Sequence, residues 1–451
     1  MPAASAARSG RDSDLWGIPM QSAGTRFIVV AILVAIAYLA VGMLSRAMAA
    51  SDTQAVAVWL AGGVSFGAWL VSPPGMRAAI LAGTVVAAAI WGIAGHALPF
   101  GAALAFSAIE TASIAIGAWI ASLRQQAARP LQAAALLVAG AIVTSVAGAT
   151  LAVELWRWLQ PGGAIDLARE WRAWAFSTIV GILLVAPVIV GFKGFAVKRS
   201  GGMPMKQFGA GAAMFALFLL TTLIVFDRSV HQRFGDVAAT LTYLPMPFLL
   251  LASMFWGPRG GAVATLVGAL LIIWLTAHGG GPFAIREGFP GESVVEVQAY
   301  VWVWAVLLLA GRALNEARRT ALAKARDWQL RYERTLQANG VASVEFDAVT
   351  GVAWWGESAE AVLGAEAAQL RNIRDWLDRV DDADRPLAQA GWEAVSAGHR
   401  DMSTDAYDIR LDGRDLHVQA RLAPVRGPDG GVERVACLLR LVTPVGAERH
   451  A

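Results

Sequence analysis

The chain has 451 residues, of which 56% are hydrophobic and 16% are charged. Its mean hydropathy of +0.52 is too high for an ordinary soluble protein of this length. The net charge of +3 is too small to indicate nucleic acid as a partner, and a single cysteine, Cys437, excludes an intramolecular disulfide and a cysteine-rich metal site.

Residues 1–26 are predicted to be a cytoplasmic leader before an integral-membrane domain at 27–314. About ten apolar segments in this domain approach the length that crosses a bilayer. They cover residues 27–44, 56–71, 78–95, 99–123, 131–153, 174–192, 208–226, 241–255, 260–276 and 297–314. Several are short or separated by tight turns, Ser72-Pro-Pro-Gly75 and Gly257-Pro-Arg-Gly260, so we expect eight to ten transmembrane helices. Ala47-Met-Ala49 resembles a signal cleavage site, but the long leader and apolar run favour an uncleaved first span.

Basic residues predict the orientation of the membrane domain. With the N-terminus inside, the inner loops before the last span are strongly basic, and their only acids are Asp12 and Asp14. Their basic residues are Arg8, Arg11, Arg26, Arg77, Arg124, Arg129, Lys193, Lys198, Arg199, Lys206 and Arg259. The outer loops have fewer basic residues and more acids. The positive-inside rule therefore places both termini in the cytoplasm.

Glu110 is an acid in the middle of a predicted span, where a carboxylate costs a few kcal/mol or more unless it is paired or hydrated. One interpretation is a hydrogen-bonded carboxyl that locks two helices together, with Ser107 or Thr111 as partner. The other is a ligand or proton site that faces a cavity in the bundle. Gly63 and Gly67 have the GxxxG spacing that lets helix backbones approach closely.

Four motifs follow one another in the membrane domain with consistent spacing. They are Val58-Trp-Leu-Ala-Gly-Gly-Val-Ser-Phe66, Ser107-Ala-Ile-Glu110, the run from Trp171 to Pro187, and Phe255-Trp-Gly-Pro-Arg-Gly-Gly261. Together they resemble the membrane-associated sensor family, type one, from about Ala31 to Ala317. The resemblance implies an input module of a bacterial inner-membrane receptor, of the kind that precedes histidine kinases or cyclic-di-GMP enzymes.

The chain departs from the family pattern at four positions. Leu60 and Ala61 stand where Pro-Pro or Pro-Ala is expected, Ser107 replaces an expected Asn, and Thr178 stands where an acid often precedes the Gly181 motif. We take Glu110, Ser107 and Thr178 as candidate ligand-sensing residues in the membrane. The departures argue against assuming that the family shares one ligand.

Residues 315–335 are predicted to form a juxtamembrane signalling helix. Its apolar residues recur at spacings of three and four: Leu314, Ala317, Ala321, Ala325, Trp328 and Tyr332. This stripe suits a short parallel coiled coil in a homodimer. The alternative is a single helix whose basic residues touch anionic lipid.

Residues 336–443 are predicted to form a soluble α+β domain, followed by a tail at 444–451. Strands are expected at 341–346, 352–355, 404–411, 416–425 and 432–443, with helices at 358–363 and 385–397 between the second and third strands. Asp412-Gly413 and Gly427-Pro-Asp-Gly-Gly431 are typical hairpin turns. The order indicates a five-stranded antiparallel sheet with helices on one face.

This C-terminal segment resembles a PAS domain, most clearly from Leu411 to Thr443. PAS domains bind a small ligand between sheet and helices or act as dimerising relays. Trp354, Trp355 and His417 are candidate residues of such a pocket or interface, and Trp376 and Trp392 are expected in the core or a dimer face. Cys437 is expected to be a buried thiol. The cofactor, if there is one, is unknown, because no residue pattern indicates flavin or haem.

No phosphate-binding loop, phosphorylated-histidine box or cyclase motif is found, so the chain is not expected to be an enzyme. The leading hypothesis is a sensor that relays an envelope or membrane stimulus through the soluble domain to a separate histidine kinase, cyclase or response regulator. One alternative is a small-molecule transporter or permease with a regulatory tail. Another is the truncated input half of a sensor kinase or cyclic-di-GMP enzyme, since no output module is predicted after the last strand.

Overall fold

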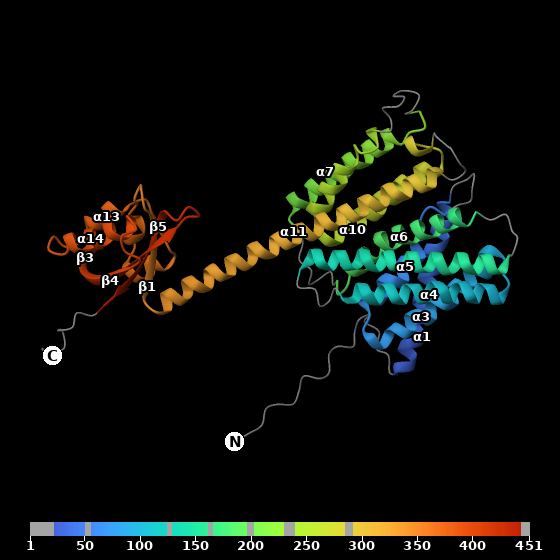
Figure 1. Cartoon of the computed structure of the whole chain (residues 1–451), viewed down its shortest axis with the longest axis horizontal. Helices are drawn as coiled ribbons and strands as arrows, with labels where there is room; N and C mark the ends of the chain where they lie inside the picture. The colour runs from blue at the N-terminus through green and yellow to red at the C-terminus, as the bar shows by residue number, and fades with distance from the viewer. Residues whose placement is uncertain are drawn as a thin grey trace, which may run out of the picture. The chain divides into compact units, whose positions relative to one another are not determined.

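The computed structural model describes residues 22–49, 56–123, 129–160, 166–195, 203–229, 240–284 and 292–442. The chain forms two compact units, Met1–Arg318 and Arg319–Ala451. The described part of the first unit is helical, and the second is built on an antiparallel sheet (Figure 1).

Most predicted apolar segments form the helices of the N-terminal unit. They are α1 (Ala23–Ala47), α2 (Leu60–Val71), α3 (Arg77–His96), α4 (Phe100–Ser122), α5 (Pro130–Leu159), α6 (Leu167–Gly191), α7 (Met205–Val225), α10 (Met246–Ala277) and the first part of α11 (Glu292–Ala338), which continues into the second unit. Among the described residues, 8 helices are long and apolar enough to cross a membrane. The helix α2, with 12 residues, is shorter. The predicted range of eight to ten helices is therefore confirmed at its lower end.

The predicted segments 241–255 and 260–276 are the two arms of α10, which breaks at Gly257. This glycine has φ 68° and ψ −164°, a conformation that other residues rarely adopt. A Cβ placed on Gly261 would lie 2.7 Å from the carbonyl oxygen of Ser253. Residues eight apart in a straight helix are separated by about 12 Å along the axis. The arms 246–256 and 258–277 therefore fold back on each other.

The segment predicted at 56–71 is helical only from Leu60, because Ala57–Trp59 is non-helical and packed inside the bundle. From there α2 lies against α6 at the predicted GxxxG pair. A Cβ on Gly63 would lie 2.4 Å from the carbonyl oxygen of Gly181, and one on Gly67 would lie 2.8 Å from Ile189 Cδ1. Only glycine permits this close approach, so the GxxxG spacing lets α2 pack directly on α6.

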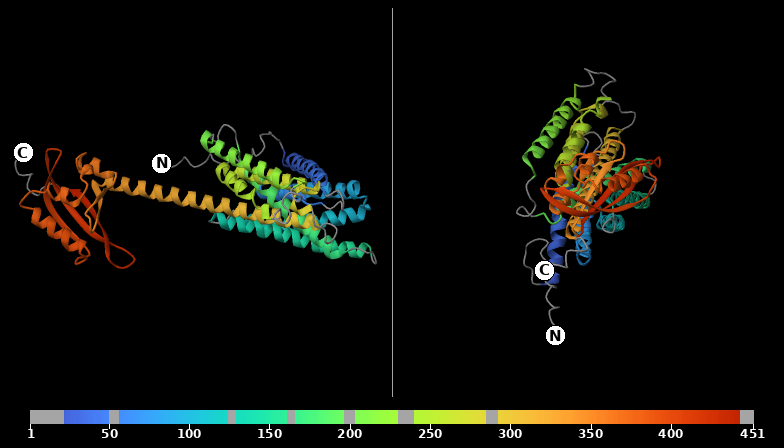
Figure 2. Two further views of the ribbon diagram at one scale, coloured as in Figure 1. Left: turned by 90° about the horizontal axis from the view of Figure 1, so that it is seen from above. Right: turned by 90° about the vertical axis from the view of Figure 1, so that its left-hand side faces the viewer.

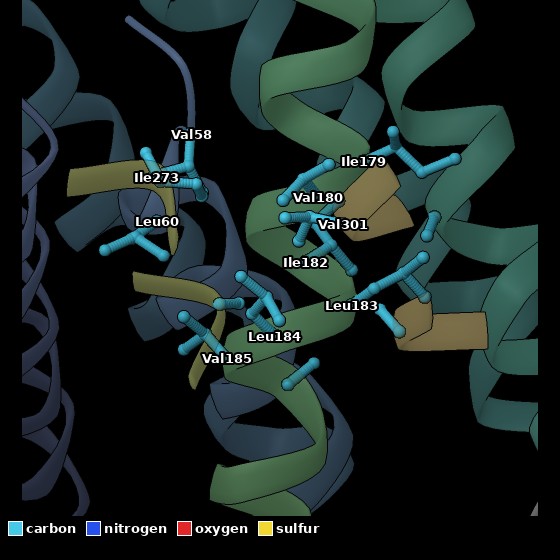
Figure 3. Close-up of a cluster of buried hydrophobic side chains, with 14 of the residues drawn as sticks. Val58, Leu60, Ile179, Val180, Ile182, Leu183, Leu184, Val185, Ile273 and Val301 are labelled. Carbon is cyan, nitrogen blue, oxygen red and sulfur yellow. The ribbon is translucent and has the colours of Figure 1, made fainter. Parts of the chain in front are cut away.

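Apolar side chains of α2, α6, α10 and α11 meet in the main core of the bundle. Figure 3 shows part of this cluster, with Val58, Leu60, Ile182, Ile273 and Val301 directed into the same region. The non-helical segment before α2 and the first part of α11 therefore belong to one packed interior.

Contacts along neighbouring helices show their directions. Gly83 near the start of α3 lies against Ala31 of α1, whereas Trp91 near its end lies against Gly42, so α1 and α3 are parallel. The contacts of Gly63 and Gly67 show in the same way that α2 runs parallel to α6.

Two contacts show how α11 runs relative to the ends of the bundle. The side chain of Arg259, beside the break in α10, donates from Nε to the carbonyl of Gly191 at the end of α6 (2.9 Å). Further from that end, Gln298 in the second turn of α11 donates to the carbonyl of Ala57 before α2. The helix α11 then runs towards the end that carries Arg259, which we call the Arg259 side. The described chain therefore enters at α1 and leaves through α11 on this side.

The C-terminal unit contains the predicted five-stranded antiparallel sheet in the order β2-β1-β5-β4-β3. Its strands are β1 (Val341–Asp347), β2 (Ala353–Trp355), β3 (Ser403–Leu411), β4 (Arg414–Arg426) and β5 (Val432–Leu441). The helices α12 (Ser358–Leu363), α13 (Ile373–Leu377) and α14 (Arg385–Ser396) pack on the buried face of the sheet (Figures 1 and 2).

The predicted turn Asp412-Gly413 is confirmed, since both residues have positive φ, at 49° and 71°. This combination is that of a two-residue hairpin turn, which matches the twist of the flanking strands. The strand predicted at 432–443 ends at Leu441, and Thr443 lies outside the described residues.

Candidate functional site

Glu110 on α4 is hydrogen-bonded to α1 and to the residue before α2. Tyr38 of α1 donates its hydroxyl proton to Oε2 at 2.7 Å, and the indole Nε1 of Trp59 donates to Oε1 at 2.8 Å. Glu110 follows the start of α4 by ten residues, about 15 Å along the helix axis. The carboxylate therefore joins three helices near the middle of a bilayer-sized span.

Aromatic rings surround these hydrogen bonds. The rings of Tyr38 and Trp59 are 5.9 Å apart in an edge contact, and Trp91 of α3 lies 5.5 Å from Trp59. Small residues make room for them, since a Cβ on Gly42 would already contact both tryptophans. Tyr38 is fully buried, whereas Trp59, Trp91 and Glu110 keep partial exposure.

The first turn of α2 lies beside the carboxylate. A Cβ on Gly62 would be 3.8 Å from Glu110 Oε1. The N-terminal end of a helix carries partial positive charge, which stabilises a nearby anion. Among the described residues no lysine or arginine forms an ion pair with Glu110. The site can thus hold a charge without a basic partner, and protonation or a cationic ligand would perturb α1, α2 and α4 together.

The non-helical segment Ala57–Trp59 is held by three other helices. The amide of Trp59 donates to the carbonyl of Ser177 on α6 at 2.9 Å. The amide of Leu60 donates to the hydroxyl of Ser45 on α1 at 3.0 Å. Non-helical backbone at membrane depth needs such partners, because no water or lipid group there can replace them.

Gln298 of α11 completes the attachment of this segment. Its Nε2 donates to the carbonyl oxygen of Ala57 at 3.0 Å, and its side chain is fully buried. A short path of bonds therefore leads from the Glu110 carboxylate through Trp59 and Ala57 to α11. Gln298 is not among the residues predicted from the sequence, although an amide inside the last apolar segment indicates a buried polar contact.

The other predicted membrane residues do not reach Glu110. Ser107 donates to the carbonyl of Leu104 in its own helix at 2.9 Å. The hydroxyls of Thr111 and Thr178 are buried and have no hydrogen-bond partner in the described part of the chain. The expectation that Ser107 or Thr111 locks the carboxyl is therefore wrong. Tyr38 and Trp59 take that role, because their longer side chains span the gap between helices.

In the C-terminal unit, Trp354 and Trp355 line an open cleft of about 840 Å³ beside the edge strand β2. Trp355 is part of the core and donates from Nε1 to the carbonyl of Leu370 at 2.8 Å. Trp354 is 47% exposed, with the guanidinium of Arg434 over its ring. Trp355, Trp376 and Trp392 therefore belong to the core, whereas Trp354 lies at the surface.

His417 does not contribute to this cleft. It stands opposite Asp408 on the exposed face of the sheet, and its Nδ1 lies 2.7 Å from Asp408 Oδ1. Cys437 is buried as predicted, and burial raises the pKa of its thiol to about 12. In the described residues no group of three or more metal-ligating side chains could hold a metal ion.

The last part of α11 is attached to the sheet of its own unit through Glu333. One carboxylate oxygen of Glu333 accepts from the hydroxyl of Ser343 on β1 (3.5 Å), and the other accepts from the amide of Ser358 at the start of α12 (3.2 Å). A Cβ on Gly356 would lie 2.8 Å from the same carboxylate. The helix therefore touches both β1 and α12.

A family model described as MASE1 matches residues 28–319. No curated protein sequence matches the chain. A sensory box histidine kinase/response regulator from Burkholderia thailandensis matches with 20% identity and a TM-score of 0.22, over 25% of this chain and 85% of that one. A domain of a putative light and redox sensing histidine kinase from Haloarcula marismortui matches with 20% identity and a TM-score of 0.21, over 25% of this chain and 98% of that one. At these scores neither likeness carries a conclusion about fold or function.

Proposed function

Because the chain belongs to the MASE1 family of membrane sensor domains, we propose that it is a non-enzymatic receptor of a bacterial inner membrane. In this proposal the helical bundle detects an envelope or membrane stimulus. The C-terminal unit is a PAS domain that passes the signal to a separate cytoplasmic kinase, cyclase or response regulator.

The observation that carries this proposal is the continuity of α11, visible in Figure 2. One end of this 47-residue helix is bonded through Gln298 to the segment that also holds Glu110, and the other end is bonded through Glu333 to β1 and α12. A displacement of Trp59 therefore has a direct mechanical route to the C-terminal unit. A carrier would have no need for this route.

The distribution of charge supports a cytoplasmic C-terminal unit. The described basic residues Arg77, Lys193 and Arg259 lie on the Arg259 side of the bundle, where the described chain also enters and leaves. The positive-inside rule assigns that side to the cytoplasm.

The exposed stripe on α11 supports a homodimer. Leu314, Trp328 and Tyr332 are 65%, 74% and 53% exposed, although they are apolar or aromatic. A second copy of α11 would cover them. In a Cys437→Ser background, Ala325→Cys on the stripe should form a disulfide-linked dimer in membranes, and Ala323→Cys on the opposite face should not. Equal crosslinking at both positions would exclude the parallel dimer.

The relay is tested by hydrogen exchange on the full-length chain in proteoliposomes. Glu110→Gln should change the protection of residues 341–363, and Gln298→Ala should abolish that change. Crosslinking in native membranes should then recover a kinase, cyclase or response regulator on the C-terminal unit. Unchanged protection in Glu110→Gln would refute the relay, and recovery of the chain alone would refute a separate effector.

One observation favours transport as a second candidate. The helix α2 begins near the Glu110 carboxylate after a non-helical segment, and carriers bind substrates at such interrupted helices. Substrate flux in proteoliposomes that is lost in Glu110→Gln would support this alternative.

A further inference from the structure

Two tight turns on the Arg259 side carry arginines that the proposed relay does not use. One is the turn at Pro74–Met76, which is followed by Arg77. The other is the break in α10, which is followed by Pro258 and Arg259. We propose that these turns bind a phosphate-bearing anion, supplied by an anionic phospholipid headgroup or by a free phosphate compound.

The first turn holds two hydrogen-bond donors without an acceptor. The guanidinium of Arg77 lies over the indole ring of Trp69, 5.0 Å from its centroid. Arg77 Nε and Trp69 Nε1 are both buried and have no hydrogen-bond partner in the described part of the chain. A buried donor without an acceptor is costly, and a partly buried cation without an anion is more so. An oxygen-rich anion would satisfy both.

The second turn orients Arg259 in a similar way. Its Nε donates to the carbonyl of Gly191, and its guanidinium lies over the ring of Phe195, 5.0 Å from the centroid. These contacts fix the planar group, and in the described part of the chain its terminal nitrogens form no hydrogen bond, so they can bind a further acceptor. No carboxylate of the described chain forms an ion pair with Arg77 or Arg259.

The two turns lie at the same level of the bundle. The helix α2, which ends just before the first turn, runs parallel to α6, and Gly67 packs against Ala186 and Ile189 in the last turns of α6. Arg259 caps the same end of α6 through Gly191. Lys193 follows at this end and is exposed. The level corresponds to a membrane interface, where phosphate groups of lipids lie.

The chemistry of the donors suits an oxyanion rather than a small halide, and the interfacial level makes phosphate the oxyanion at hand. A guanidinium presents several N–H groups in one plane, which match the oxygens of phosphate in pairs. An indole N–H adds one neutral donor. The same arrangement would not select a cation or an uncharged lipid.

The test uses the full-length chain in nanodiscs and measures retained lipid by native mass spectrometry. The nanodiscs are assembled with phosphatidylcholine alone or with a mixture of phosphatidylcholine and phosphatidylglycerol. The double variant Arg77→Gln/Arg259→Gln should retain about tenfold less phosphatidylglycerol than the native chain. Arg157→Gln is the matched control, because Arg157 is an exposed arginine at the far end of α5 that already pairs with Glu154.

A second arm distinguishes the source of the phosphate. In detergent without lipid, inorganic pyrophosphate should raise the melting temperature of the native chain, but not that of the double variant, if the phosphate group alone suffices. Stabilisation by phosphatidylglycerol without any effect of pyrophosphate would assign the site to a lipid. Neither effect, or equal retention in the double variant and the control, would overturn the proposal.

A conservative variant guards against loss of folding. Trp69→Phe keeps the ring under Arg77 and removes only the indole N–H. It should fold like the native chain and still weaken retention of phosphatidylglycerol. Native retention in Trp69→Phe together with native retention in Arg77→Lys/Arg259→Lys would show that the fixed donors are irrelevant, and would also count against the site.

Discussion

Glu110 illustrates at the residue scale how a polar group inside a bilayer-sized bundle is satisfied. Both carboxylate oxygens accept from neutral donors, Tyr38 and Trp59. Replacing Glu110 by Gln turns one acceptor into a donor, so one of the two donors loses its partner. We expect Glu110→Gln to lower the free energy of unfolding by about 1–3 kcal/mol.

A double-mutant cycle isolates the contribution of the tyrosine. Tyr38→Phe should cost about 1 kcal/mol alone and markedly less in a Glu110→Ala background, which removes both acceptor oxygens, since the two side chains share one bond. Thermal unfolding in detergent measures both. Tyr243→Phe, at a 60% exposed position, is the control. Additive effects of Tyr38→Phe and Glu110→Ala would contradict the bond.

Cys437 gives a second prediction at the residue scale. Burial raises the pKa of its thiol from 9.0 to about 12, so at pH 8 the reactive thiolate is far rarer than for an exposed cysteine. A maleimide should therefore label the folded chain slowly at pH 8 and label it fully in denaturant. Val349→Cys, at a 90% exposed position, should react at once in the folded chain. Equal rates at the two positions would contradict the burial of Cys437.

Among the contacts between helices, the close packing of α2 on α6 leaves the least room for a larger side chain. A Cβ on Gly181 would lie 2.0 Å from the carbonyl oxygen of Trp59, which the backbone cannot avoid without moving α2. Gly181→Ala should therefore destabilise the chain by about 3 kcal/mol or more. Gly101→Ala is the matched control. Its Cβ would meet nothing within 4 Å, so the better helix propensity of alanine should raise stability slightly. Similar melting temperatures for both variants would contradict the helix contact.

The elements that sequence patterns predicted correctly are those governed by local rules. Apolar runs of spanning length became helices, and alternation with a two-residue turn at Asp412 and Gly413 became a hairpin. The non-helical start of the segment at 56–71 was not predictable, because Ala57 and Val58 are as apolar as a helix requires and only tertiary contacts hold them out of a helix. Hydropathy could not show that α10 folds back at Gly257.

Of the residues that form the candidate site, only Glu110 could be predicted from the sequence. An acid in an apolar run identifies Glu110 by cost alone, since burial of a charge is expensive wherever it occurs. Its partners come from α1 and from the residue before α2, 72 and 51 positions away. Serine and threonine nearby in sequence were the obvious candidates for partners. Their short side chains instead donate hydrogen bonds to carbonyls of their own helix, as Ser107 does.

At the scale of the whole molecule, α11 is the single element shared by the two compact units. Its residues from 314 to 335 are largely exposed, so few tertiary contacts stabilise this stretch. Signal transfer along it would depend on an unbroken helix. A break there should uncouple the units without unfolding either of them, because each unit has its own hydrophobic core.

Ala321→Pro tests this dependence. Proline removes one backbone hydrogen bond and costs about 3 kcal/mol in a helix interior, an amount that a locally exposed helix cannot offset. We expect Ala321→Pro to leave the melting of both units unchanged and to abolish the effect of Glu110→Gln on hydrogen exchange in residues 341–363. Ala321→Ser is the control, since it keeps the helix. If the exchange effect survived in Ala321→Pro, the signal would reach the C-terminal unit by a route other than α11. The proposed relay would then be wrong even with Glu110 as the sensing residue.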